Sequence, residues 1–199
     1  MTRFECLKAI AAKVGDALVV CSAGGATTDW YHLRPSEGNF RSRTLGLVSS
    51  IGLGLALSLP DRKVIVLDGD GSALMNLCGL PTAAFAAPGN LIHIVFDNRV
   101  YESSAASVTA TAGPTDLVAV ARGAGFPRAV WAKTVDEFAR AVTDALAGSQ
   151  LTFIGVRVEL GRPDLPPITI DDVENKYRFV RHIEQLEGRE IFGTSYPDS

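Results

Sequence analysis

The chain is predicted to be an α/β protein with three layers, in which helices cover both faces of a mainly parallel sheet. Short apolar runs rich in valine and isoleucine alternate with longer segments that have helical spacing. Polar or glycine-containing turns separate these segments. With 199 residues, of which 47% are hydrophobic, the chain is long enough to bury one sizeable core.

Strands are expected where short apolar runs end in turn-forming residues. They are predicted at residues 17–21, 64–68, 91–96, 128–131 and 151–158. Helices are expected where apolar residues recur at intervals of three or four. They are predicted at residues 3–14, 27–33, 45–59, 73–87, 115–124 and 135–147. Segments 35–44 and 99–114 are rich in small polar residues, so both are predicted to be loops, and the second is expected to be mobile.

Turns separate the predicted strands and helices, and a charged C-terminal segment follows them. The turn at residues 22–25 ends the first strand, residues 60–62 precede the second, and residues 88–89 precede the third. We expect residues 1–170 to form one domain and residues 171–199 to form a helical tail. The helical spacing of residues 171–187 is compatible either with packing on the domain or with binding to a partner.

Composition and charge exclude several classes of protein. The formal charge of −3 gives no electrostatic signature of nucleic-acid binding, and no apolar run is long enough to cross a bilayer. The amino terminus lacks the residue order of a signal peptide, so a cytoplasmic location without membrane partners is expected. Cys6, Cys21 and Cys78 lack a Cys-x-x-Cys spacing and are expected to be buried thiols rather than disulfide or metal-binding cysteines.

The most informative motif joins the second and third predicted strands. The second strand runs into Gly69-Asp70-Gly71-Ser72, and the third runs into Asp97-Asn98. Open parallel sheets bind ligands beyond the carboxyl ends of their strands, where the turn at residues 22–25 would also lie. Carboxylate and amide oxygens suit Mg²⁺, which shares its coordination sphere with phosphates. The glycines and a following helix N-terminus suit an anion, so the motif predicts a diphosphate held through a metal.

Each part of this motif also has a simpler interpretation. A single Asp-Gly pair is commonly a turn, and a lone asparagine is commonly a cap. The interpretation as a ligand site rests on the conjunction, because all the parts follow predicted strands. The chain lacks both the Walker A motif and the Gly-x-Gly-x-x-Gly motif, which disfavours a P-loop or a dinucleotide site.

Gly69-Asp70-Gly71-Ser72 followed by Asp97-Asn98 resembles the cofactor motif of thiamine-diphosphate-dependent enzymes, which opens with Gly-Asp-Gly and closes with Asn. Segments 17–25, 45–57 and 60–63 resemble the diphosphate-binding domain of sulfopyruvate and phosphonopyruvate decarboxylases. The resemblance covers roughly residues 3–160. It implies the thiamine-diphosphate-binding fold, with thiamine diphosphate and Mg²⁺ as cofactors.

The resemblance also implies roles for individual residues. Asp70 and Asn98 would be the side-chain ligands of Mg²⁺, and the carbonyl of Val100 would be the third protein ligand. Leu45 matches the bulky residue that holds the cofactor in its bent conformation, although core packing is an equal alternative. Arg43 stands before Thr44 where the family commonly has Gly-Ser, and its carbonyl would accept a hydrogen bond from the aminopyrimidine. The other cofactor-binding residues would be Ser22, Gly24, Gly25, Gly69, Gly71 and Ser72.

The residues after Asn98 are candidates for contacts with the substrate. Arg99 would pair with a sulfonate or phosphonate, and Glu102 would transfer protons as a catalytic residue, although either side chain could simply be solvated. His32 is a further candidate acid or base, whereas His93 is expected to be a core residue. The same loop holds Tyr101, Ser103 and Ser104.

The resemblance finally implies an incomplete active site. In the resembling enzymes a glutamate that protonates the aminopyrimidine comes from a pyrimidine-binding domain, and no segment here resembles that domain. We therefore expect a beta-type subunit of a two-subunit decarboxylase for a small 2-oxoacid. Its partner would be a pyrimidine-binding alpha-type subunit, in a homodimer or hetero-oligomer. Two alternatives stay open: a subunit of another thiamine-dependent lyase or carboligase, and a non-catalytic regulatory subunit that binds the cofactor.

Overall fold

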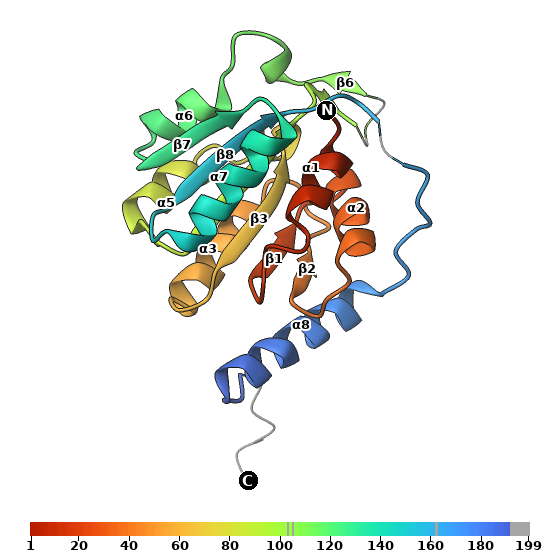
Figure 1. Cartoon of the computed structure of the whole chain (residues 1–199), viewed down its shortest axis with the longest axis vertical. Helices are drawn as coiled ribbons and strands as arrows, with labels where there is room; N and C mark the ends of the chain where they lie inside the picture. Colours follow the sequence, from red (N-terminus) through yellow and green to blue (C-terminus); the bar gives the residue numbers. More distant parts are fainter. Residues whose placement is uncertain (103, 105, 162, 192–199) are drawn as a thin grey trace.

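A parallel sheet forms the centre of the computed structural model, which describes residues 1–102, 104, 106–161 and 163–191 (Figure 1). Its strand order is β2-β1-β3-β4-β8-β7. The strands are β1 (Leu18–Cys21), β2 (Asn39–Arg41), β3 (Val64–Gly69), β4 (Leu91–Asp97), β7 (Arg128–Ala132) and β8 (Thr152–Arg157). The three-layer α/β/α fold predicted from the sequence is confirmed.

Helices cover both faces of this sheet (Figure 1). One face carries α1 (Arg3–Ile10), α2 (Gly25–Leu33) and α7 (Val135–Ala147). The other carries α3 (Val48–Ser58), α5 (Gly79–Ala86) and α6 (Leu117–Gly123). Alternate strand residues enter the two cores, with Ile65 in the first and Val66 in the second. Burial on both faces explains why the strands are continuous apolar runs in the sequence.

The ends of three neighbouring strands position the candidate site. β1 pairs with β3 up to Cys21↔Leu67, and β3 pairs with β4 up to Gly69↔Phe96. Because these strands are parallel, the segments that follow Cys21, Gly69 and Asp97 leave the sheet at the same edge.

Two predicted helices differ from the structure. Instead of one helix over residues 73–87, the chain forms α4 (Asp70–Leu74) and α5, with a turn between them that contains Cys78. Cys78 is therefore exposed, and only Cys6 and Cys21 are buried as expected. The helix predicted from residue 45 begins at Val48, because Gly46 has a φ of +81° that no α-helix accommodates.

Both predicted loops contain regular structure. Residues 35–44 include β2, a short edge strand paired with β1. Residues 99–114 include the hairpin of β5 (Val100–Tyr101) and β6 (Ser107–Val108), followed by the 3₁₀ helix η1 (Ala110–Ala112). Thr109 and Thr111 are buried there, and their hydroxyls contact buried carboxylates. The prediction that residues 99–114 form only a loop is therefore wrong. Ser103 lies outside the described residues.

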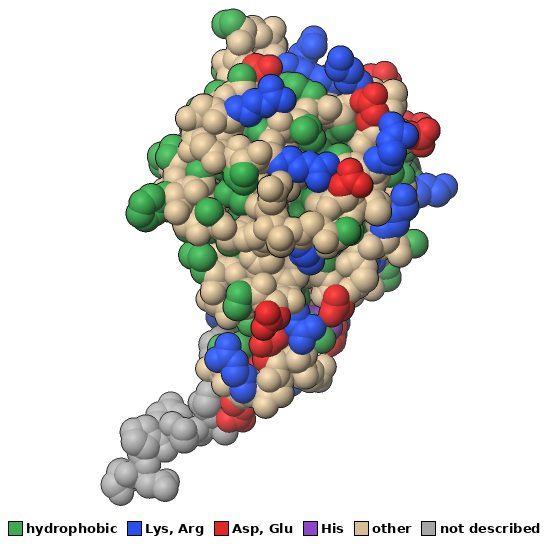
Figure 2. Space-filling view, turned by 60° about the vertical axis from the view of Figure 1, so that its left-hand side comes forward, with side chains coloured by type: hydrophobic (Ala, Val, Ile, Leu, Met, Phe, Trp, Pro, Cys, Tyr) green, Lys and Arg blue, Asp and Glu red, His purple; other side chains and the backbone are tan. Residues whose placement is uncertain are grey.

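The helix α8 (Asp172–Glu187) packs beside β2, so of the two alternatives that the sequence left open, packing on the domain is the one observed. Phe179 and Ile183 are buried in a cluster with Leu18 and Leu59. Asn175 accepts a hydrogen bond from the Arg41 N–H at 3.0 Å. Charged side chains gather on the lower end of the molecule, where α8 lies (Figure 2). The division into domains at residue 170 stays a prediction.

Three further features bear on expectations from the sequence: His93, the thiol of Cys6 and the character of the helices. His93 is buried, with its Nε2 atom 3.2 Å from Asp68 Oδ2, so it is a core residue as expected. Burial raises the pKa of the Cys6 thiol to about 11. None of the helices in the described part of the chain combines the length and the apolar character needed to cross a membrane.

The attachment of α8 depends on Phe179, which is 4% exposed and has its ring centroid 5.4 Å from that of Phe40. Phe179→Ala is expected to lower the free energy of unfolding by about 3 kcal/mol, because it removes a buried ring and leaves a cavity. Val173→Ala, at a 60% exposed position of the same helix, is the control and should change it by less than about 0.5 kcal/mol. Urea unfolding of both variants measures this, and equal effects would contradict the packing role of Phe179.

Candidate functional site

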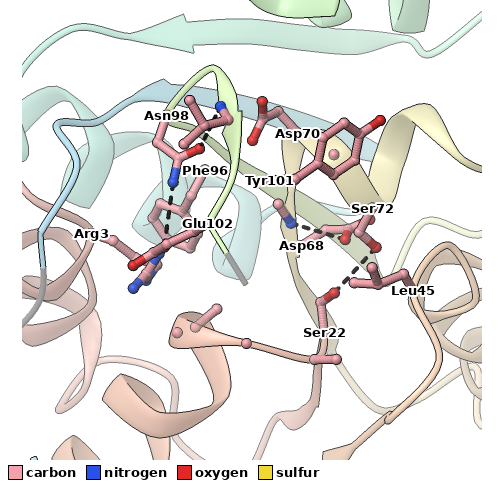
Figure 3. A pocket seen from close by; sticks show the side chains of 17 residues that line it. Arg3, Ser22, Leu45, Asp68, Asp70, Ser72, Phe96, Asn98, Tyr101 and Glu102 are labelled. Atoms are coloured by element: carbon pink, nitrogen blue, oxygen red, sulfur yellow. Dashed lines mark hydrogen bonds and ion pairs between the residues drawn. The ribbon is translucent and has the colours of Figure 1, made fainter. Parts of the chain in front are cut away.

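A cavity of about 270 Å³ lies at the carboxyl ends of β1, β3 and β4 (Figure 3). Three segments surround it: residues 22–26 after β1, residues 68–72 at the end of β3, and residues that follow β4 up to Glu102. Leu45, from the loop before α3, and Arg3, from the start of α1, complete its wall. The fold therefore brings together side chains that are far apart in the sequence.

Most of the predicted site residues line this cavity. They are Ser22, Gly24, Gly25, Leu45, Gly69, Asp70, Gly71, Ser72, Asn98, Val100 and Glu102. Leu45 is half-buried, which suits a wall of the cavity as well as packing.

Three candidate residues lie outside the lining of this cavity. The side chain of Arg43 is 69% exposed, and its Nε atom lies 2.7 Å from Asp172 Oδ2 on α8. Arg99 is exposed, with a φ of +65°. His32, near the end of α2, lines a separate pocket that includes residues 167–170.

The Asp70 carboxylate is a deeply buried charge in the lining of the cavity. It is 2% exposed, and its Oδ2 atom accepts hydrogen bonds from Thr109 Oγ1 at 2.6 Å and Thr111 Oγ1 at 3.1 Å. Burial raises the pKa of Asp70 above its ordinary value, and these hydroxyls partly oppose that shift. The environment therefore holds a carboxylate whose charge is poorly solvated, which favours a cation beside it.

Thr111 connects Asp70 to a second buried carboxylate. Its Oγ1 atom lies 2.7 Å from Asp97 Oδ1, while Asp97 Oδ2 lies 2.8 Å from Arg157 Nη1. The Arg157 guanidinium lies over the Trp131 ring, 4.7 Å from its centroid. These contacts fix η1 and the end of β4 against Asp70.

A serine pair joins the turn after β1 to α4. Ser22 Oγ donates to Ser72 Oγ at 3.1 Å, and Ser72 Oγ also accepts the Gly46 N–H at 3.0 Å. The second bond holds the loop that carries Leu45 against α4. The residue before Ser72 has to be glycine, because a Cβ added to Gly71 would lie 2.5 Å from the Tyr101 ring.

Asn98 is oriented by its neighbours. Its Oδ1 atom accepts the Val100 N–H at 3.1 Å, and its Nδ2 atom donates to Glu102 Oε2 at 3.3 Å. Glu102 Oε2 also accepts a hydrogen bond from Arg3 Nη1 at 3.0 Å (Figure 3). This chain of contacts links the predicted metal ligand Asn98 to the start of α1.

Sequence reasoning missed Arg3, Thr109 and Thr111. Arg3 is an ordinary residue of the first helical turn in the sequence, and the threonines lie in a segment of small polar residues. Within the residues that the structure describes, no group of three or more His, Cys, Asp or Glu side chains is arranged to hold a metal. The predicted ligands differ from such a group, because they are one carboxylate, one amide and one backbone carbonyl.

The fold and this cavity define an α/β protein with a polar cavity at the carboxyl edge of a parallel sheet. The family model described as "Thiamine pyrophosphate enzyme, C-terminal TPP binding domain" matches residues 22–156. Thiamine pyrophosphate is another name for thiamine diphosphate. The chain belongs to this family of thiamine-diphosphate-binding domains.

Two relatives illustrate where this domain occurs. The chain is 40% identical over 184 residues to "Sulfopyruvate decarboxylase subunit beta" of Methanothermobacter thermautotrophicus, a match that covers 92% of this chain and 96% of the relative. It is 37% identical over 183 residues to "Phosphonopyruvate decarboxylase" of Streptomyces viridochromogenes, which covers 89% of this chain but 45% of the relative.

Solved structures share the fold. The thiamine diphosphate-dependent 4-hydroxybenzoylformate decarboxylase of Rhodococcus jostii RHA1 has a TM-score of 0.68 at 22% identity. The benzoylformate decarboxylase of Polynucleobacter necessarius has a TM-score of 0.64 at 19% identity. These matches cover 82% and 84% of this chain but only 33% and 34% of the solved chains, so the domain is one part of those proteins.

The buried charge of Asp70 has a testable effect on the metal-free chain. Because its folded-state pKa is raised, the folded chain takes up a proton more readily than the unfolded chain. Ionisation of Asp70 therefore lowers stability as the pH rises above the ordinary carboxyl pKa of 3.8. Asp70→Asn keeps an oxygen that accepts from the threonines, and it is expected to raise the melting temperature in EDTA at pH 7.5.

The gain should shrink as the pH falls toward 4, where the carboxyl group of the unaltered chain becomes protonated. Thermal unfolding followed by circular dichroism at both pH values measures the difference. Asp61→Asn, in the exposed turn after α3, is the control and should give no pH-dependent gain. A loss of stability in Asp70→Asn that is the same at both pH values would contradict the electrostatic account.

Proposed function

We propose that this chain is the beta-type subunit of a two-subunit thiamine-diphosphate-dependent 2-oxoacid decarboxylase. The observation that carries the proposal is the cavity where Asp70, Asn98 and the turn after β1 meet. The match to nearly the whole of a protein named as a sulfopyruvate decarboxylase beta subunit supports it. We propose a cytoplasmic location, as expected from the sequence.

The residues around the cavity suit a diphosphate held through Mg²⁺. Asp70 Oδ, Asn98 Oδ1 and the Val100 carbonyl would be the protein ligands, and hard oxygen donors of this kind are those that Mg²⁺ prefers. The buried charge of Asp70 supports a cation at this position. The carboxylate is 2% exposed, and the hydrogen bonds described for its Oδ2 atom come from neutral hydroxyl groups, so no positive charge balances it through them. The backbone of Gly71, the Ser72 hydroxyl and the turn at residues 22–25 would hold the phosphates.

The remaining residues of the site would orient the cofactor and exclude water. Thiamine diphosphate, when bound, supplies a thiazolium ring that accepts the electrons released as carbon dioxide leaves a 2-oxoacid. Leu45 would press on the cofactor from the wall opposite Arg3, and the Phe96 and Tyr101 rings would keep water from the cavity (Figure 3). We propose that the Arg43 carbonyl accepts a hydrogen bond from the aminopyrimidine. Glu102 Oε2, which already accepts two hydrogen bonds, would accept or return a proton during turnover.

We propose a pyrimidine-binding alpha-type subunit as the partner and a short 2-oxoacid with a second anionic group as the substrate. The relatives named above act on sulfopyruvate and phosphonopyruvate, which belong to this class. In the phosphonopyruvate decarboxylase, the matched region covers less than half of the protein, which leaves room for a second domain. The subunit named as beta supports a separate chain with that role.

Metal-dependent cofactor binding is the first test. Isothermal titration calorimetry is expected to show that the chain binds thiamine diphosphate with Mg²⁺ and loses at least about tenfold in affinity in EDTA. Asp70→Ala should abolish the effect of Mg²⁺, because it removes an ionic ligand, whereas Asp61→Ala should retain it. Equally tight binding to Asp70→Ala with and without Mg²⁺ would exclude Asp70 as a metal ligand.

Turnover is the second test. The chain alone is expected to release little carbon dioxide from sulfopyruvate, phosphonopyruvate or pyruvate, since the pyrimidine-side groups are supplied by the partner. Adding a pyrimidine-binding alpha-type subunit should restore turnover, with kcat/KM highest for an acid that carries a second anionic group. Full turnover by the chain alone would contradict the two-subunit proposal, and a preference for pyruvate would contradict the proposed substrate class.

A further inference from the structure

Arg3 is a buried cation that neither the sequence motif nor the family resemblance assigns to the site. It is 6% exposed, although it lies on the first turn of α1 and its guanidinium lines the cavity. Its Nε atom donates to Asp29 Oδ2 at 2.8 Å, and its Nη1 atom donates to Glu102 Oε2 at 3.0 Å. The third nitrogen, Nη2, is buried and has no hydrogen-bond partner among the described residues.

Such an arrangement is unfavourable unless a ligand completes it. A buried donor of a charged group that makes no hydrogen bond loses its hydration without compensation. Asp29 is fully buried and holds Nε, so the guanidinium is fixed in direction rather than mobile. Gly25 lies directly over Nη2, because a Cβ added to it would be 2.0 Å from that atom. The backbone of the turn after β1 therefore leaves room for the guanidinium at the wall of the cavity.

The charge balance of the cavity shows which ligand this nitrogen suits. Of the described residues that line the cavity, Arg3 is the single Lys or Arg, whereas Asp68, Asp70 and Glu102 bring carboxylates. Asp68 is paired with His93, and Asp70 is the predicted metal ligand. A diphosphate carries more negative charge than one Mg²⁺ neutralises, so a second cation at its side is favourable.

We propose that Arg3 Nη2 binds the diphosphate of the cofactor, an inference that rests on the proposed function. Arg3 is linked through Glu102 to Asn98, which places it beside the predicted metal ligands. Gly25, in the turn that would hold the phosphates, lies against Nη2. These two contacts favour the phosphate end over the substrate as the partner of Arg3.

Two carboxylates share Arg3, and they have different roles in this proposal. Asp29 is completely buried and stays bound to Nε, so it is a positioning residue for the guanidinium. The Glu102 side chain is 28% exposed, so it is able to turn toward solvent when an anion approaches. The anion then replaces Glu102 as the neighbour of Nη1, while Nη2 gains the partner that it lacks.

The test is calorimetric titration of the full chain with thiamine diphosphate and Mg²⁺. Arg3→Gln is expected to weaken binding roughly 10- to 100-fold, because it removes charge-assisted hydrogen bonds to phosphate. Magnesium pyrophosphate, which lacks the organic part, should show a similar loss. Asp29→Asn is the matched control: it removes the charge of the buried ion pair but keeps the guanidinium and an oxygen that accepts from Arg3 Nε, so the affinity should fall far less.

The double variant Arg3→Gln/Asp29→Asn distinguishes a loss of folding from a loss of binding. It removes both charges of the buried Arg3–Asp29 ion pair, so neither position keeps an unpaired charge. It should fold, as judged by circular dichroism, and bind as weakly as Arg3→Gln. Unchanged affinity in the folded double variant, or an equal loss in Asp29→Asn alone, would overturn the role of Arg3. Absence of magnesium-dependent binding in the unaltered chain would overturn the proposed function itself.

A second measurement distinguishes the cofactor from the substrate as the source of the anion. With the partner present and the cofactor saturating, Arg3→Gln should leave the ratio of kcat/KM for sulfopyruvate over pyruvate unchanged. A fall in this ratio with unchanged cofactor affinity would assign Arg3 to the substrate and overturn the proposal.

Discussion

The burial of the Asp70 carboxylate is the constraint on which the rest of the site depends. An ionised group that is 2% exposed is unfavourable by itself, so the fold surrounds it with groups that stabilise its charge. Thr109 and Thr111 donate to it, and Thr111 also contacts Asp97, which is held by Arg157. The segment after β6 is therefore arranged around the charge of Asp70. A bound cation would relieve the unfavourable part of burying that charge.

Much of the fold could be predicted from the sequence because buried parallel strands are continuous apolar runs. The motif around Asp70 and Asn98 could also be placed, since parallel topology brings strand ends to one edge. The edge strand β2 could not be predicted from the sequence. Its last residue, Arg41, is held by Asn175, which lies 134 residues further along the chain. The same reason explains why sequence reasoning missed Thr109, Thr111 and Arg3. The threonine hydroxyls belong to the site only through their tertiary contact with Asp70, and the Arg3 guanidinium only through Asp29 and Glu102.

The comparisons show one domain in two contexts. It fills 96% of a protein named as a beta subunit and 45% of a phosphonopyruvate decarboxylase. The cavity described above is built from one edge of one sheet, with Leu45 on one wall and Arg3 on the opposite wall. We propose that such a site binds the phosphate end of the cofactor, and that a second domain, fused or separate, supplies the groups for its other end. We propose that this chain represents the separate arrangement.

The most direct test of this account is the position of the metal in a complex of the chain with thiamine diphosphate and Mn²⁺, a substitute for Mg²⁺ with strong anomalous scattering. We predict one metal peak at about 2.0–2.3 Å from oxygens of Asp70, Asn98, the Val100 backbone and the diphosphate. A diphosphate bound in the cavity without a metal at Asp70, or a metal ligated elsewhere in the chain, would contradict it.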